Sequence, residues 1–185
     1  DVADKGVGAA LYMALSRTIL RTYVFEHPDQ PALAFNAANR RIFVDAQTDL
    51  FVTTFYGLID PASGEMTYCN AGHNPPYVLR RAGGEALPLK LTGIPLGMFE
   101  DSQWTARTIT LDVGDRVLLY TDGVTEAQNM AGDFFGEARL LDVARTNLTR
   151  PVADMQQTIL AAIHTFVGDA PQADDITLLV LGREG

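Results

Sequence analysis

Hydrophobic residues in this chain repeat with a helical period in two separate blocks, and a block of β-type composition lies between them. Apolar residues recur every three or four positions from Gly6 to about Phe25 and from about Pro31 to Asp45, with a His-Pro-Asp-Gln-Pro breaker between the two segments. The same periodicity returns at residues 137–146 and 152–167. Helices, then strands, then helices and a last strand predict an α+β layered domain.

The middle block is expected to form short antiparallel strands. Residues 51–59 are rich in β-branched and aromatic side chains, and after an Asp-Pro-Ala-Ser-Gly turn, residues 65–70 can return as a hairpin partner. Further strands are expected at residues 76–80, 106–111 and 116–120. Residues 176–181 form a continuous apolar run, which predicts a central strand covered on both faces.

Apolar spacing also predicts which helix faces are buried. The candidates for the inner face of the second helix are Leu33, Ala37, Ile42 and Phe43. Those for the last helix are Met155, Ile159, Ile163 and Phe166. The first helix carries an apolar stripe made of Tyr12, Met13, Leu20 and Phe25. Two alternatives stay open for this stripe, burial in the core or formation of a homodimer.

Composition describes an ordinary globular protein. The 185 residues suit a single domain with its own core, and 47% of them are hydrophobic. The net charge of −9, from 23 acidic and 14 basic residues, disfavours binding to nucleic-acid phosphates. Neither an apolar run of about 18 residues nor a signal-peptide pattern is present, so this segment is not expected to span a membrane. The single cysteine, Cys69, excludes an internal disulfide framework and favours a reducing, cytoplasmic location.

Three short acidic segments stand where predicted elements begin or end. Asp1 and Asp4 precede the first helix, Asp122 ends an apolar strand, and Asp174 and Asp175 stand at the entrance to the last apolar run. Carboxylates at the ends of buried elements are costly unless a cation meets them, and the chain offers few basic residues nearby. A shared divalent metal ion would meet this need, which makes metal-assisted hydrolysis the leading hypothesis. For each segment taken alone, a turn closed by aspartate side chains remains the alternative.

The glycine that follows the second acidic segment has its own expected role. Gly123 is expected to allow a backbone conformation that most residues resist, and Glu126 adds another carboxylate four residues after Asp122.

Other catalytic schemes find little support. The histidines His27, His73 and His164 lack the spacing of zinc ligands, and the Gly-x-Ser-x-Gly motif of serine hydrolases is absent. His73 is expected to organise a turn through hydrogen bonds, and Cys69 to be a buried structural thiol. The glycines before the first helix do not follow the Walker pattern of phosphate-binding loops.

Six motifs, in order, resemble a known enzyme family. They are D-V-A-D-K-G-V-G-A-A-L, F-V-T-T-F-Y-G, N-A-G-H-N-P-P, G-I-P-L-G, Y-T-D-G-V-T-E-A and A-D-D-I-T-L-L-V. This series is similar to the SpoIIE/RsbU-like bacterial branch of the PPM, or type 2C, metal-dependent Ser/Thr protein phosphatases. The resemblance runs from Asp1 to about Leu181, which is nearly the whole chain.

The resemblance implies a fold and a metal site. The fold would be an α+β, four-layer α-β-β-α sandwich in which two antiparallel sheets are flanked by helix pairs. The implied cofactors are two Mn²⁺ or Mg²⁺ ions, with room for a third. The ligand positions that correspond are Asp1 as the bridging carboxylate, the backbone carbonyl of Val2, Asp122 and Asp174. Secondary candidates are Asp175, Glu126 for an outer or third metal, and Asp4, which stands where this branch commonly has glycine.

The implied reaction is hydrolysis of phosphoserine or phosphothreonine in a protein. Hard oxygen ligands favour Mg²⁺ or Mn²⁺ over zinc, and a metal pair about 3.5–4 Å apart can generate hydroxide, so the enzyme needs no catalytic nucleophile of its own. In this branch the substrate is typically a small STAS-type anti-anti-sigma regulator, whose dephosphorylation releases a sigma factor.

The family places a further strand, with another metal ligand, before the position of Asp1. The chain is therefore expected to be one phosphatase domain over residues 1–185 that lacks its N-terminal strand, from a parent protein with a sensory or receiver domain upstream. The alternative is a degenerate, non-catalytic phosphatase-fold module that binds a regulatory protein. A metal phosphodiesterase acting on nucleotides is disfavoured, because histidines and a base-stacking aromatic loop are lacking. Metal titration separates an enzyme from a pure binding module.

Overall fold

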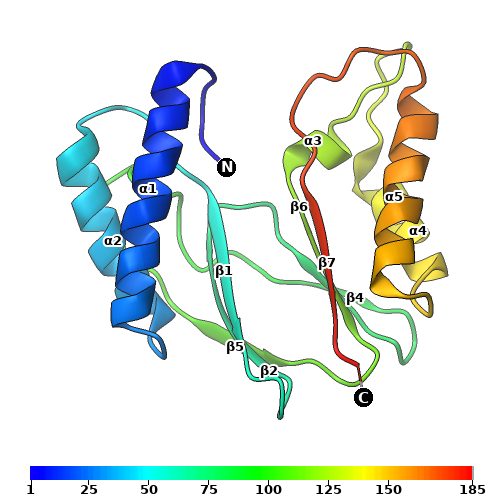
Figure 1. Cartoon of the computed structure of the whole chain (residues 1–185), viewed down its shortest axis with the longest axis horizontal. Helices are drawn as coiled ribbons and strands as arrows, with labels where there is room; N and C mark the ends of the chain where they lie inside the picture. The colour runs from blue at the N-terminus through cyan, green and yellow to red at the C-terminus, as the bar shows by residue number, and fades with distance from the viewer. Residues whose placement is uncertain (185) are drawn as a thin grey trace. The chain divides into compact units, whose positions relative to one another are not determined.

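The structure, a computed structural model, describes residues 1–184 and contains two compact units (Figure 1). Unit 1 consists of residues 1–73 and 90–110, and unit 2 of residues 74–89 and the chain from Leu111 onward. Each unit has one antiparallel sheet and helices that pack on it, which confirms the predicted α+β class with two antiparallel sheets. Within the described residues, no helix has the length and apolar character needed to cross a membrane.

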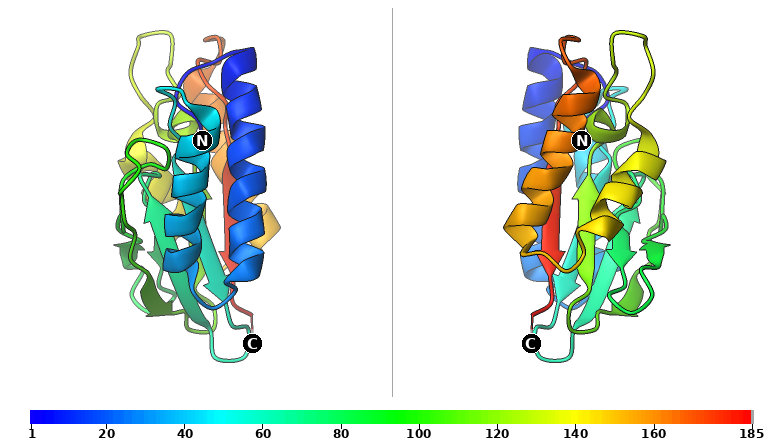
Figure 2. Two further views of the ribbon diagram at one scale, coloured as in Figure 1. Left: turned by 90° about the vertical axis from the view of Figure 1, so that its left-hand side faces the viewer. Right: turned by 90° about the vertical axis from the view of Figure 1, so that its right-hand side faces the viewer.

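Unit 1 pairs two long helices with a three-stranded sheet. The helices are α1 (Val7–Glu26) and α2 (Pro31–Ala46), which agree closely with the predicted segments and lie side by side in Figure 2. Pro31 starts α2, where the missing N–H of proline costs nothing. The strands are β1 (Thr54–Ile59), β2 (Glu65–Ala71) and β5 (Arg107–Thr110), in the order β1-β2-β5. The predicted hairpin is confirmed, since β1 and β2 pair from Thr54↔Ala71 to Ile59↔Met66.

The core of unit 1 corrects two expectations about helix faces. The buried residues of α2 are Pro31, Ala34, Phe35, Ala38, Asn39 and Ile42. Leu33 and Phe43 were expected on this face but are exposed, because the small side chains of Ala34 and Ala38 let the helix approach its neighbours closely. The expected stripe on α1 is not one face either: Tyr12 is buried in the core, whereas the side chain of Phe25 is 71% exposed.

Unit 2 is built around a four-stranded sheet. Its strands are β3 (Tyr77–Leu79), β4 (Ala86–Pro88), β6 (Arg116–Tyr120) and β7 (Leu178–Gly182), in the order β4-β3-β6-β7. Its helices are α3 (Asp122–Thr125), α4 (Gly136–Thr146) and α5 (Val152–Val167). The sequence predicted all of these except the short elements α3 and β4.

The last strand corrects another expectation. Strand β7 was predicted to be central and covered on both faces, but it lies at an edge of the sheet formed by the described residues. Its burial alternates: Leu178 and Val180 are buried, whereas Leu179 and Leu181 are exposed. A continuous apolar run does not by itself distinguish a central strand from an edge strand, because only the pairing of its backbone decides.

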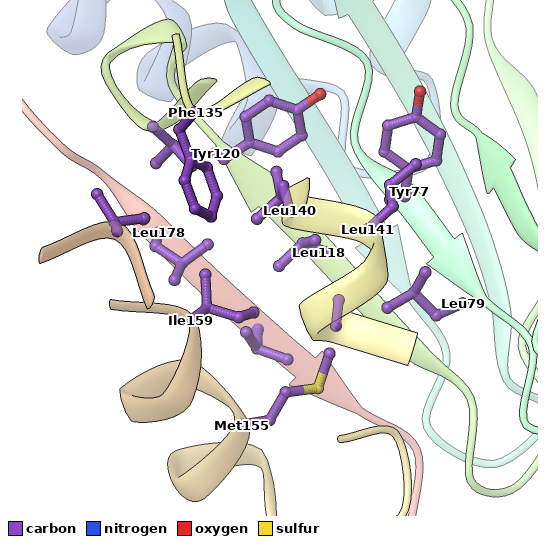
Figure 3. Packing of buried hydrophobic residues seen from close by; sticks show 14 of the residues in the cluster. Tyr77, Leu79, Leu118, Tyr120, Phe135, Leu140, Leu141, Met155, Ile159 and Leu178 are labelled. Carbon is purple, nitrogen blue, oxygen red and sulfur yellow. The ribbon is translucent and has the colours of Figure 1, made fainter. Parts of the chain in front are cut away.

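The core of unit 2 lies between this sheet and the helices α4 and α5 (Figures 2 and 3). Leu118 of β6, Leu140 of α4 and Ile159 of α5 are fully buried in it. The predicted inner face of α5 is confirmed for Met155, Ile159 and Ile163, and Phe166 is half-buried against the same cluster. This packing fixes β6, whose end carries the acidic segment at Asp122.

A buried ion pair holds the turn before β6. The Asp115 carboxylate, which is 1% exposed, accepts a hydrogen bond from the Arg80 guanidinium at 2.5 Å and from the backbone N–H groups of Arg81 and Asp112. Burial raises the pKa of the Asp115 carboxyl, but the two backbone donors and the arginine outweigh it and hold that pKa below its usual range. The pair therefore anchors the start of the strand that leads to Asp122.

Candidate metal-binding site

Asp122 stands at the junction of β6 and α3 and is half-buried. Its Oδ1 accepts a hydrogen bond from the Gly123 backbone N–H at 2.9 Å, and its backbone carbonyl accepts one from the Glu126 N–H at 2.7 Å. The turn of α3 follows directly, so the carboxylate is held at the N-terminal end of a helical turn. The exposed Glu126 directly follows the last residue of the same turn.

The segment with the paired aspartates runs directly beside the end of β6. The ladder between β6 and β7 ends at the pair Tyr120↔Leu178. Beyond it, the Thr121 backbone N–H donates to the Thr177 carbonyl oxygen at 3.1 Å, and the Thr121 hydroxyl donates to the Asp175 carbonyl oxygen at 3.1 Å. The structure therefore brings the two acidic segments of unit 2 together, as the resemblance implies.

Gly123 fits this contact because it has no side chain. A Cβ on Gly123 would collide with the carbonyl oxygen of Asp175 and would lie 2.9 Å from its carbonyl carbon and 3.5 Å from that of Asp174. Gly123 was expected to supply an unusual backbone conformation, but its φ is not positive. The requirement is a close approach of two backbones instead.

The aspartates at 174 and 175 are both exposed. The Asp174 Oδ1 accepts a hydrogen bond from the Asp175 N–H at 2.8 Å, and the Gln172 side-chain amide donates to the Asp174 backbone carbonyl at 2.8 Å. These local bonds are the turn-type interactions that the alternative interpretation expected. A turn of this kind does not prevent a ligand role, because a carboxylate has two oxygens with about four lone-pair sites and can accept more than one bond.

The remaining candidates belong to unit 1. The backbone of Asp1 and that of Thr53 exchange two hydrogen bonds, of 2.8 and 2.7 Å, and the Ala3 N–H donates to the Phe51 carbonyl at 3.0 Å. Val2 lies between these bonds in an antiparallel bridge to Val52. In this pattern the carbonyl of the middle residue points away from the partner strand. The Val2 carbonyl is thus directed away from Val52, as a backbone ligand would need to be.

Asp4 is held in a strained conformation. Its φ is 83°, in the left-handed region that favours glycine, and its Oδ1 accepts a hydrogen bond from the Lys5 N–H at 2.8 Å. This geometry explains why glycine commonly fills the corresponding place in the family that the motifs resemble. The Asp4 carboxylate caps its own turn.

A polar pair next to Asp1 was not singled out from the sequence. The Thr53 hydroxyl and His73 Nδ1 are 3.2 Å apart, and the His73 backbone N–H donates to the Asn70 side-chain oxygen at 2.9 Å. The acceptor in this turn is the Asn70 side chain, whereas the His73 ring meets Thr53 of a distant segment, so the turn-organising role expected of His73 stays a prediction. Cys69 is buried as expected, and burial raises the pKa of its thiol to about 11.

The candidate ligands are suited in type to hard divalent cations. All are carboxylate or backbone carbonyl oxygens, the donors that Mg²⁺ and Mn²⁺ prefer. Asp1, Val2 and Asp4 belong to unit 1, and Asp122, Glu126, Asp174 and Asp175 to unit 2. Across residues 1–184, no three His, Cys, Asp or Glu side chains gather closely enough to hold a metal ion by themselves. The contact between the Asp122 and Asp174 segments is the part of the site that the structure describes.

Comparisons with known proteins agree with the motifs. The family model described as stage II sporulation protein E (SpoIIE) matches residues 1–184. The chain is 31% identical to protein IcfG of Synechocystis over 99% of its length and 27% identical to the phosphoserine phosphatase RsbU of Bacillus subtilis over 100%. It spans only 33% and 54% of the lengths of these two relatives.

Solved structures show the same fold. The crystal structure of the RsbU and RsbW domains of Rv1364c from Mycobacterium tuberculosis aligns with 100% of this chain and 50% of that one, with a TM-score of 0.79 and 30% identity. The catalytic domain of the serine threonine protein phosphatase PstP, in complex with two manganese ions, aligns with 97% of this chain and 84% of that one. Its TM-score is 0.68 at 16% identity, so this likeness concerns the fold alone.

Proposed function

The chain belongs to the SpoIIE family, and from that membership we propose that it is a metal-dependent phosphatase that hydrolyses phosphoserine or phosphothreonine in a protein. The observation that carries the proposal is the contact between two segments far apart in the sequence. Gly123 packs against the Asp174–Asp175 backbone, so Asp122 and Asp174 come from neighbouring chain segments at one end of the sheet in unit 2. Carboxylates gathered in this way are the donors that a pair of hard cations needs.

The roles of the ligands follow from their positions. Asp122 and Asp174 would hold the cations from unit 2, and Asp1 would be the bridging ligand, with the Val2 carbonyl beside it. The Gly123 backbone N–H in the turn of α3 donates to the Asp122 carboxylate and helps to orient it. Asp175, Glu126 and Asp4 would be auxiliary, for an outer or third cation.

When bound, two such cations would lower the pKa of water and offset the negative charge of the phosphoryl oxygens. The protein's own part is to fix the carboxylates and to admit a phosphorylated side chain. No serine, cysteine or histidine is required as a nucleophile in this scheme. Manganese and magnesium suit the donor set equally. The manganese ions named for PstP support a divalent cofactor.

The substrate class follows from the relatives. RsbU of Bacillus subtilis is named a phosphoserine phosphatase, and the similar structure from Mycobacterium tuberculosis joins an RsbU domain to an RsbW domain. These names support a phosphorylated regulatory protein as the substrate, and we propose a STAS-type anti-anti-sigma factor in the bacterial cytoplasm. We further propose that residues 1–185 act as one phosphatase domain, regulated by a sensory or receiver domain elsewhere in a longer protein.

The rival proposal is a non-catalytic module that only binds such a regulator. It would use the same fold to bind the regulator without holding a metal ion. The two proposals differ in their dependence on metal. An enzyme needs the cations for turnover, whereas a binding module retains its affinity for the partner in the presence of a chelator.

The test is hydrolysis of a phosphoserine peptide, measured by phosphate release with Mn²⁺, with Mg²⁺ and with a chelator. We expect turnover that requires the metal and that falls by at least about 100-fold in Asp122→Asn and Asp174→Asn. Asp169→Asn changes an exposed aspartate of unit 2 outside the acidic segments and is the matched control. Turnover in the chelator, or full activity in both site variants, would overturn the proposal.

A further inference from the structure

We propose that Thr121 is a positioning residue, whose hydroxyl holds the Asp174 segment in register with Asp122. This inference rests on the proposed function, because it concerns how the two carboxylates are held for a metal ion. Thr121 lies immediately before Asp122, but nothing in its position requires its side chain to be a ligand. Its role is read from the hydrogen bonds that its hydroxyl makes with the segment that carries the other carboxylate.

The Thr121 hydroxyl bonds to the neighbouring segment twice. It accepts a hydrogen bond from the Thr177 backbone N–H at 3.1 Å and donates one to the Asp175 carbonyl oxygen at 3.1 Å. The Thr121 N–H adds a third bond, to the Thr177 carbonyl oxygen, also at 3.1 Å. A hydroxyl can accept and donate at once, so the single oxygen of serine or threonine can make both bonds, whereas the side chain of valine can make neither.

These hydrogen bonds join the two segments beyond the last residue pair of the sheet. The ladder between β6 and β7 ends at Tyr120↔Leu178, and the residues that carry Asp174 lie beyond it, without regular structure. Residues 174 and 175 are exposed, so little packing restrains them. The hydroxyl thus extends the pairing of the two segments by one step past the last strand pair. Asp174 directly precedes the residue whose carbonyl is anchored.

The steric fit of Gly123 is consistent with this arrangement. The Asp175 carbonyl oxygen that accepts the Thr121 hydroxyl is the same atom that fills the space beside Gly123. The residues on either side of Asp122 therefore both act on the Asp175 carbonyl: Thr121 donates a hydrogen bond to it, and Gly123 leaves the space that it occupies. Their joint effect is to set the distance between the Asp122 and Asp174 segments before any metal binds. Residues that orient a metal ligand in this way typically change metal affinity by about 10- to 100-fold.

The experiment compares Thr121→Val, which keeps the shape and removes the hydroxyl, with Thr121→Ser, which keeps the hydroxyl. Thr165→Val is the matched control, because Thr165 is an exposed threonine of unit 2 whose hydroxyl bonds only within α5. Two quantities are measured for each protein: the dissociation constant for Mn²⁺ by calorimetry, and amide hydrogen exchange at Thr177 without metal.

For Thr121→Val we expect Mn²⁺ binding about 10- to 100-fold weaker and faster exchange of the Thr177 amide, with the serine variant and the control close to the unsubstituted protein. Unchanged Mn²⁺ affinity in Thr121→Val, whatever its exchange rate, would overturn the positioning role. If the unsubstituted protein itself bound no Mn²⁺ and hydrolysed no phosphopeptide, the proposed function would fail, and the positioning role with it. The two failures are therefore distinguishable.

Discussion

The backbone carbonyl of Asp175 occupies the space that a Cβ on Gly123 would need. Gly123→Ala should therefore push the Asp174–Asp175 segment away from Asp122. Because the position of a Cβ is fixed by its own backbone and the group that it meets is a backbone carbonyl, the strain cannot be relieved by turning a side chain. We expect the variant to lose about 1–3 kcal/mol in the free energy of unfolding, measured by urea denaturation, and to bind Mn²⁺ more weakly by calorimetry.

The matched control for this substitution is Gly8→Ala. Gly8 lies in α1, has no positive φ, and an added Cβ would meet no atom within 4 Å. Alanine is favoured over glycine in a helix, so this variant should be as stable as the parent or more stable by up to about 1 kcal/mol. Equal stabilities for the two variants would contradict the steric account of Gly123.

Asp115→Asn should destabilise the protein through the buried pair with Arg80. Breaking an ion pair leaves a poorly compensated charge and costs about 3–5 kcal/mol when both partners are well buried. Because the Arg80 side chain is 19% exposed, we expect the loss in the free energy of unfolding to lie toward the lower end of this range. Asp112→Asn is the control, because Asp112 lies 3.6 Å from the same guanidinium but is 80% exposed. Its effect on the free energy of unfolding should stay within about 0.5 kcal/mol.

The contribution of Asp115 should also depend on pH. Its pKa is lower in the folded than in the unfolded protein, so its stabilisation is complete above the unfolded value of about 3.9 and declines as the pH falls through the folded value. Urea denaturation at pH 7 and pH 3 should therefore show the gap between the parent and Asp115→Asn narrowing at pH 3. A gap that widened with acid would contradict the assigned ion pair.

Asn39 should be important for the loop that follows Gly97. Its side-chain oxygen accepts the Gly97 N–H at 2.8 Å, and its amide donates to the carbonyls of Phe99 and Glu100 at 2.9 and 3.1 Å. Asn39→Ala leaves these three backbone groups without that partner, which should cost about 2–4 kcal/mol and speed amide exchange at Gly97. Asn36→Ala, which removes only the bond to the Trp104 N–H, should cost less.

Cys69 should be unreactive in the folded protein. Burial raises the pKa of its thiol to about 11, so the reactive thiolate is scarce below that pH, and the side chain is fully buried. Thiol titration with a disulfide reagent at pH 8 should be slow in buffer and fast in denaturing urea. Rapid reaction in buffer would show that the β2 strand opens readily.

Sequence periodicity predicted the long helices well, because a long helix contains several turns and the spacing of its apolar residues is therefore seen several times. It failed on the buried face of α2, where Leu33 and Phe43 are exposed and Asn39 is buried. Hydrophobicity alone favours the larger side chains. The structure instead uses small residues for close packing and an asparagine to satisfy loop backbone groups, and both choices depend on partners far along the chain.

The candidate site was predictable only in part. Each aspartate could be placed at the end of an element from the residues alone, but turns explained each one equally well. The contact between the Asp122 and Asp174 segments depends on the pairing of β6 with β7, which no local pattern encodes. Thr121 and Thr177 carried a usable clue, since two hydroxyl residues flank the two acidic segments. The ligand roles themselves stay predictions.

The most direct test of the account is calorimetric titration of the protein with Mn²⁺, beside Asp174→Asn and the exposed control Asp169→Asn. We expect saturable binding to the parent and to the control, and binding at least about 10-fold weaker to Asp174→Asn, because that variant loses a carboxylate ligand. Binding of Mn²⁺ with equal affinity to all three proteins would contradict the central claim that the Asp122 and Asp174 segments form a metal site.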